Sequence, residues 1–117
     1  MVKIVNDKGY ISITSEVFTN LAGDAATSCF GVKGMAGRGK EGGAFQLLRR
    51  ESMSKGVKVH FEEGGSIALE LHIGVDVGVN VTAVSRSIMK EVSYKVNQAT
   101  GVAVRNVDVC VDSMISD

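Results

Sequence analysis

The chain has 117 residues, of which 44% are hydrophobic and 22% charged, and its 13 basic residues balance 13 acidic ones. A chain of this length buries one core and is too short for two, so the sequence predicts a single domain over residues 1–117. The apolar fraction excludes a chain that is disordered throughout, and the net charge of zero excludes a uniformly basic nucleic-acid-binding protein.

The first third of the chain predicts a short strand and then a helix. Residues 10–13 favour a strand, and residues 15–30 favour an amphipathic helix, with Thr14 placed to cap its first turn. The helix is indicated by apolar residues that recur at three- and four-residue steps: Val17, Phe18, Leu21, Ala22, Ala25, Ala26 and Cys29. The glycine-rich residues 34–43 that follow predict a loop, and residues 44–51 a short helix.

The clearest strand signal in the chain is an alternation over residues 57–62 and 67–77. Residues opposite each other in a hairpin share a face, so their numbers must sum to an even value. A three-residue loop at residues 63–65 meets this condition and sets Lys58 opposite Glu70. It predicts three apolar pairs: Val57 with Leu71, Val59 with Leu69 and Phe61 with Ile67.

The last third predicts a second amphipathic helix and a final strand. The helix runs from Val81 to about Ala99, with Asn80 as its N-terminal cap and Gly101 as its stop in the left-handed conformation. The apolar phase of the final strand shifts after Val104, which predicts a bulge near Arg105. Together the elements predict an α+β fold, a two-layer sandwich whose mostly antiparallel sheet of four to five strands carries two main helices on one face. The order of the strands stays open.

Two glycine motifs in the middle of the chain resemble nucleotide-binding loops. Residues 34–40 fit the first seven positions of a phosphate-binding loop, but Glu41 stands where such a loop needs a Ser or Thr hydroxyl for the magnesium ion. Residues 37–42 match a dinucleotide fingerprint outside any strand-turn-helix unit. The 14 glycines of the chain explain both matches.

The residue types that catalyse reactions or bind metals form no evident constellation. His60 and His72 fall on the polar face of the predicted hairpin, roughly 13 Å apart at ~3.3 Å per residue, too far to share an ion. Neither histidine has an evident orienting partner, no G-x-S-x-G motif is present, and Cys29 and Cys110 fit no metal-binding spacing. We therefore predict no catalytic, cofactor-binding or metal-binding residues, and a protein that is not an enzyme.

Charge is distributed unevenly along the chain. Residues 33–58 carry seven basic residues against two acidic ones. Such a segment is either a solvated loop or a surface for an anionic partner, and in the second case the candidate partner-binding residues are Arg38, Lys40, Arg49 and Arg50. Phe45 alone offers an aromatic ring for stacking on bases, so nucleic acid is a disfavoured partner.

Several segments in a fixed order carry a family resemblance over nearly the whole chain. They include Ile11-Ser12-Ile13-Thr14-Ser15-Glu16-Val17, Gly31-Val32-Lys33-Gly34-Met35, Lys55-Gly56-Val57-Lys58-Val59, Val77-Gly78-Val79-Asn80-Val81 and Thr100-Gly101-Val102-Ala103-Val104. In these pieces the chain resembles the alkaline-shock protein family, the Asp/Gls-type cell-envelope stress proteins of Gram-positive bacteria. It departs from the family at Ser15 and Thr82, where proline is common, and in the glycine-rich residues 37–43.

The resemblance implies a small cytoplasmic, non-enzymatic protein linked to envelope or alkaline stress. It also implies self-association into a homo-oligomer and recruitment to the membrane by a separate anchor protein, with no cofactor. No apolar run approaches the ~18 to 20 residues of a membrane span, so direct insertion is not expected. The alternative function is binding of an anion, a nucleotide or RNA through the glycine-rich basic loop at residues 34–56.

Overall fold

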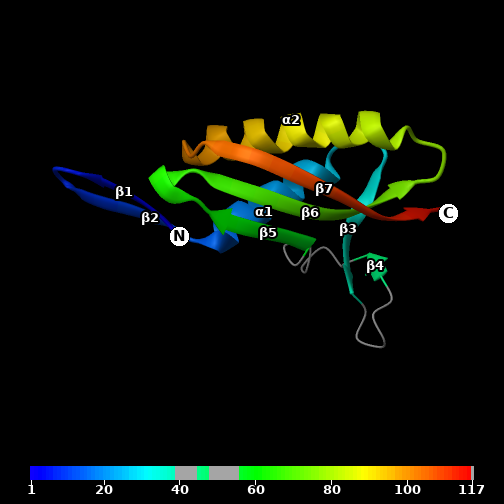
Figure 1. Ribbon diagram of the computed structural model, residues 1–117, viewed down its shortest axis with the longest axis horizontal. Helices are drawn as coiled ribbons and strands as arrows, with labels where there is room; N and C mark the ends of the chain where they lie inside the picture. Colours follow the sequence, from blue (N-terminus) through cyan, green and yellow to red (C-terminus); the bar gives the residue numbers. More distant parts are fainter. Residues whose placement is uncertain (39–44, 48–55, 117) are drawn as a thin grey trace.

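The computed structural model describes residues 1–38, 45–47 and 56–116 (Figure 1). Its elements in chain order are β1 (Val2–Asn6), β2 (Gly9–Ile13), α1 (Ser15–Thr27), β3 (Val32–Arg38), β4 (Phe45–Leu47), β5 (Val57–Phe61), the 3-10 turn η2 (Glu63–Gly65), β6 (Ile67–Asp76), α2 (Val81–Thr100) and β7 (Val104–Ile115).

Strand β6 is the centre of a five-stranded sheet. Along one edge it pairs antiparallel with β5 and then with β3, which in turn pairs with β4. Along its other edge it pairs parallel with β7, because the intervening helix α2 carries the chain back to the start of the sheet. Strands β1 and β2 form a separate antiparallel hairpin. The predicted α+β class is confirmed, and β6–β7 is the parallel pair in a mostly antiparallel arrangement.

Both helices pack on one face of the sheet and enclose the core with it (Figure 1). The odd-numbered side chains of β6 point toward the helices, and each is at most 1% exposed: Ile67, Leu69, Leu71, Ile73 and Val75. Phe18 of α1 and Ile88 of α2 meet them from the other side and are fully buried. The even-numbered side chains of β6 point to the opposite face, which neither helix covers and which is called the open face below.

Several predicted details of the sheet are confirmed. The β5–β6 hairpin has the expected register, with Val57 opposite Leu71 and Lys58 opposite Glu70. The register of β7 slips at Arg105, since Val104 pairs with Ile67 while Asn106 pairs with Ala68. This slip is the bulge that the phase change indicated. Gly101 ends α2 with a φ of 75°, as its position predicted.

Helix α1 ends at Thr27 instead of continuing to residue 30. The backbone N–H of Ser28 donates to the carbonyl of Asp24, and that of Cys29 to the carbonyl of Ala26, which tightens the last turn. Gly31 then turns the chain with a φ of 86°, so Phe30 lies outside the helix. The predicted boundary was wrong because the apolar pattern continues for a few residues past the turn.

The glycine-rich segment was assigned wrongly as far as the structure describes it. Residues 34–38 belong to β3 and not to a loop, because Met35 pairs with Ile73 and is fully buried in the core. Burial of this side chain and the ladder to β6 outweigh the conformational entropy that strand glycines lose. Phe45–Leu47 is a strand on the edge of β3, so the predicted helix over residues 44–51 is wrong there; the rest of that segment lies outside the described residues.

Strand β1 was not predicted. It exists because its partner β2 follows at once in the chain, and the pairing of Val2 with Ile13 lets Val2 reach the core. Neither helix in the described part of the chain has both the length and the apolar character that crossing a membrane requires.

The two helix starts differ in their caps, which leads to a first prediction. The Asn80 side chain accepts a hydrogen bond from the backbone N–H of Ala83 at 3.0 Å, as predicted, whereas the Thr14 side chain makes no capping bond, contrary to prediction. We expect Asn80→Ala to lower the free energy of unfolding by about 1 kcal/mol. Thr14→Ala, the matched control, should change it by less than half as much. Urea unfolding followed by circular dichroism measures both, and equal losses would contradict the difference in capping.

Candidate functional site

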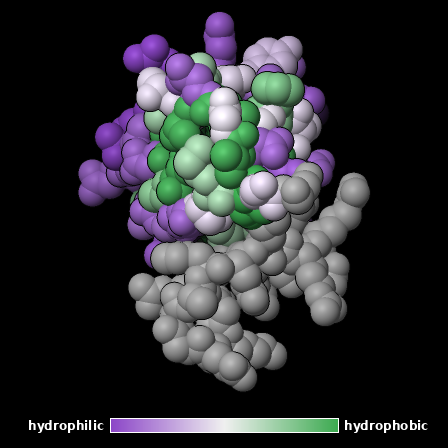
Figure 2. All heavy atoms as spheres, turned by 90° about the vertical axis from the view of Figure 1, so that its right-hand side faces the viewer, coloured by the Kyte–Doolittle hydropathy of each residue, from purple (hydrophilic) through white to green (hydrophobic). Residues whose placement is uncertain are grey.

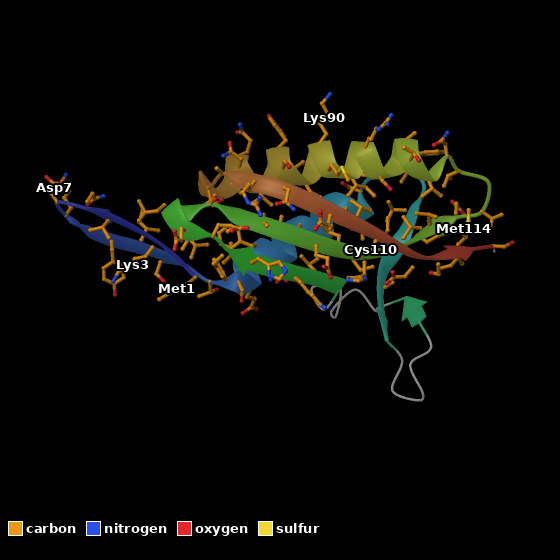
Figure 3. All side chains as sticks on the ribbon, in the orientation of Figure 1. Met1, Lys3, Asp7, Lys90, Cys110 and Met114 are labelled. Carbon is orange, nitrogen blue, oxygen red and sulfur yellow. The ribbon has the colours of Figure 1, made fainter. Side chains whose placement is uncertain are left out.

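The molecule is elongated, with extents of 54 × 31 × 21 Å, and its large exposed apolar side chains gather at the two ends. At one end the β1–β2 hairpin projects from the body (Figures 1 and 3). At the other end the chain turns from α1 into β3 and from β6 into α2, beside the end of β7 (Figure 1). The two ends are built differently and are described in turn.

The hairpin carries apolar side chains on both of its faces. Ile4 and Ile11 are cross-strand partners, 39% and 53% exposed, on the face whose inner pair, Val2 and Ile13, packs at the core. Val5 and Tyr10 are partners on the other face and are also exposed. These four residues, Ile4, Val5, Tyr10 and Ile11, are called the hairpin patch. The apolar face of the hairpin thus extends past the body that covers its base.

The opposite end carries a second set, Phe30, Val77 and Met114, called the tip patch. Phe30 is 89% exposed, and the other two are more than half exposed. Backbone hydrogen bonds bring their segments together: Asp76 donates to the Gly31 carbonyl at 2.9 Å, and Val77 to the Ile115 carbonyl at 3.3 Å. Figure 2 shows apolar side chains gathered at this end. Exposed apolar surface of this kind is typical of interaction sites.

A groove of about 430 Å³ runs between the two helices. Small and polar side chains from the end of α1 and from α2 line it: Leu21, Asp24, Ala25, Ser28, Lys95, Gln98 and Ala99. This lining includes neither histidine nor cysteine, so the groove does not bring together a base and a nucleophile of the usual kinds.

The open face of the sheet carries a polar network centred on His72. Its Nε2 lies 2.7 Å from a carboxylate oxygen of Glu70, and its Nδ1 lies 2.9 Å from one of Asp112. The expectation that neither histidine has an orienting partner is therefore wrong for His72. Asp112 was missed because it lies 40 positions away in the sequence, and only the parallel pairing of β6 with β7 brings it alongside.

The network shifts the pKa values of its members. Burial of the His72 ring acts to lower its pKa, but the hydrogen bonds and charges of Glu70 and Asp112 outweigh burial and raise it. The hydrogen bond from His72 is the main cause that lowers the pKa of Glu70. Cys110 pairs with His72 across the β6–β7 ladder, and burial followed by the nearby carboxylates raises the pKa of its thiol. The free thiol is thus held protonated and is a poor nucleophile.

The remaining predicted residues are placed as follows. His60 lies on the open face opposite Ala68, as predicted. Arg38 ends β3, opposite Phe45, but its side chain is not described, and Lys40, Arg49 and Arg50 lie outside the described residues. Partner binding by these four basic residues stays a prediction.

Comparison with known proteins gives matches over most of the chain. The family model of the alkaline-shock proteins, described as having a "cell envelope-related function", matches residues 3–116. The uncharacterized protein YloU of Bacillus subtilis is 36% identical over 107 residues, which cover 91% of this chain and 88% of that protein. The uncharacterized protein Spy1614 of Streptococcus pyogenes serotype M6 is 32% identical over 114 residues, covering 97% and 93%.

Solved structures of the MamM CTD are similar in fold. One variant matches with a TM-score of 0.52 at 18% identity, covering 87% of this chain and 100% of that chain. A copper form of another variant matches with the same score, identity and coverage. At this identity the likeness shows the fold alone.

Proposed function

This chain belongs to the alkaline-shock protein family, whose function is cell envelope-related, and we propose that it acts there as a non-enzymatic interaction module that binds copies of itself and docks to a partner protein. The observation that carries the proposal is the exposure of large apolar side chains at both ends of an elongated body. Two separate patches allow two separate contacts.

The hairpin patch is the proposed self-association surface. An isolated two-stranded hairpin is marginally stable in water, and here the outer pair Ile4 and Ile11 is left without cover. The outer edges of β1 and β2 pair with no other strand in the described residues, and an identical hairpin offers the complementary donors and acceptors. A second copy would therefore satisfy both the apolar face and a free edge.

The tip patch is the proposed docking surface for the partner protein. Phe30 is the type of residue that serves as an anchor in protein interfaces, because a large rigid ring gains much apolar burial at low entropic cost. We expect the partner to be an envelope protein that holds this chain at the membrane. The family's cell envelope-related function supports that expectation.

The proposed absence of catalysis is supported by the described residues alone. The groove between α1 and α2 lacks a base paired with a nucleophile, and the His72 network lies on the open face of the sheet rather than in an enclosed pocket.

Self-association is tested by light scattering after size exclusion over a range of concentrations. We expect the wild-type chain to exceed the monomer mass, and Ile11→Ser to weaken association at least tenfold, a loss of about 1.4 kcal/mol. Met89→Ser is the matched control, because Met89 is exposed to a similar degree but lies on α2, away from both patches. A wild-type monomer at every concentration, or an equal loss in the control, would refute the hairpin patch as the contact.

Partner docking is tested by separating membranes from soluble material in a Gram-positive host that expresses the chain. Phe30→Ser should shift the protein from the membrane fraction to the soluble fraction, whereas Met89→Ser should not. Light scattering of the purified Phe30→Ser variant should still give the wild-type mass. Membrane retention unchanged by Phe30→Ser would rule out the tip patch as the docking surface.

A further inference from the structure

We infer that the open face of the sheet holds a binding site for a divalent cation of the zinc class, with Glu70, His72 and Cys110 as its ligands. The inference rests on the geometry of β6 and β7 and does not depend on the proposed function. It concerns a part of the molecule distinct from both apolar patches.

The three ligand groups converge because of strand pairing. His72 and Cys110 are partners in the parallel ladder, and Glu70 precedes His72 by two residues on the same face. Their ligand atoms all lie within 4.8 Å of one another. Donor atoms around a tetrahedral zinc ion are roughly 3.5 Å apart, given bonds of about 2.0–2.3 Å, so side-chain adjustments of about 1 Å complete the site. Figure 3 shows Cys110 on β7, the strand that supplies the thiol.

Asp112 positions the imidazole for metal binding. Its carboxylate lies 2.9 Å from Nδ1 of His72 and leaves Nε2 directed toward Glu70, 2.7 Å away. The register of β7 slips between Val111 and Ser113, so that Asp112 is an extra residue on its strand, and such bulges re-aim side chains. A carboxylate on the far nitrogen of a metal-binding histidine fixes its tautomer and raises its basicity.

The charges around the site favour a cation. Carboxylates from Glu70, Asp108 and Asp112 surround Cys110 and act on its thiol, while Lys58 is the nearby cation, 3.8 Å from Glu70. The Lys58 side chain is 66% exposed, so solvent screens this ion pair and a divalent ion can displace it.

The donor set selects the class of metal. Thiolate and imidazole donors with one carboxylate suit zinc and exclude magnesium or calcium, which prefer oxygen ligands. Three protein ligands leave a fourth position to water or another ligand. On binding, the thiol proton of Cys110 and any proton on Nε2 of His72 pass to solvent.

The test uses the full chain without an affinity tag, freed of metal by chelation and titrated with Co²⁺ as the spectroscopic probe and then with Zn²⁺ in competition. We expect one ion per chain and a thiolate-to-cobalt charge-transfer band in the near ultraviolet. Cys110→Ser should abolish that band, and the matched control Cys29→Ser should keep it. Asp112→Asn should retain the band but weaken affinity by about 10- to 100-fold.

The outcomes separate metal binding from a merely structural network. Circular dichroism of each variant establishes that it is folded, and Asp112→Asn provides a readout that keeps every ligand in place. Absence of a charge-transfer band in the wild type, or its persistence in Cys110→Ser and loss in Cys29→Ser, would overturn the site. Affinity unchanged in Asp112→Asn would overturn the positioning role of that carboxylate.

Discussion

Ile73→Ala should lower the free energy of unfolding by about 3–5 kcal/mol. Ile73 is fully buried in the central strand β6, where it pairs with Met35 of β3 and Val111 of β7. Truncation removes apolar contacts and leaves a cavity, because three paired strands and the helices above them cannot collapse onto it. Urea unfolding of dilute protein, followed by circular dichroism, measures the loss.

Ile11→Ala is the matched control, because the same atoms are removed from a side chain that is 53% exposed. It should cost less than about 1 kcal/mol in dilute solution, since little apolar surface is returned to water. Its effect should instead be on association, as Ile11→Ser tests. Similar losses of stability in the two variants would mean that the hairpin is covered in solution or that β6 is not the centre of the core.

Gly31→Ala should have the second-largest effect, about 2–4 kcal/mol. Its φ of 86° is strained for alanine at about 1–2 kcal/mol. The added methyl carbon would also lie 3.1 Å from Cγ1 of Val79 and 3.2 Å from Cγ2 of Val84, and such overpacking costs about 1–3 kcal/mol. Gly31 therefore serves both the turn after α1 and the packing of that turn against the start of α2.

Gly78→Ala separates the two causes. Gly78 has a φ of 95°, but nothing lies within 4 Å of the position that a Cβ would take. Its substitution should cost only the backbone term, about 1–2 kcal/mol. Thermal and urea unfolding of both variants give the difference, and a Gly78→Ala loss as large as that of Gly31→Ala would refute a packing role for Gly31.

The interaction patches and the cation site occupy different parts of the molecule. Both patches are at the ends of the long axis, whereas Glu70, His72 and Cys110 lie on the strands in the middle of the open face. Variants at Ile11 or Phe30 should therefore leave cobalt binding unchanged, and Cys110→Ser should leave the oligomer mass unchanged. Each surface can be tested without disturbing the other.

Local sequence patterns determined much of the fold. The alternation in β5 and β6, with the parity of a three-residue loop, set their register, and the side chain of Asn80 and the left-handed glycine at 101 set the ends of α2. These features depend on residues close in the sequence, whose geometry is nearly independent of the rest of the chain. The family resemblance was likewise carried by short segments, and the family match over residues 3–116 confirms it.

Contacts between distant segments decided the rest. The glycine-rich segment became β3 because β6 offered its backbone a ladder and Met35 a place in the core, and a glycine count does not contain either. Asp112 and Cys110 came beside His72 through the parallel pairing of β6 and β7, and Phe30 was exposed by a turn that interrupted its helix. Periodicity shows which face of an element is apolar, but which segments meet depends on the free energy of burying those faces together, a property of the whole folded chain.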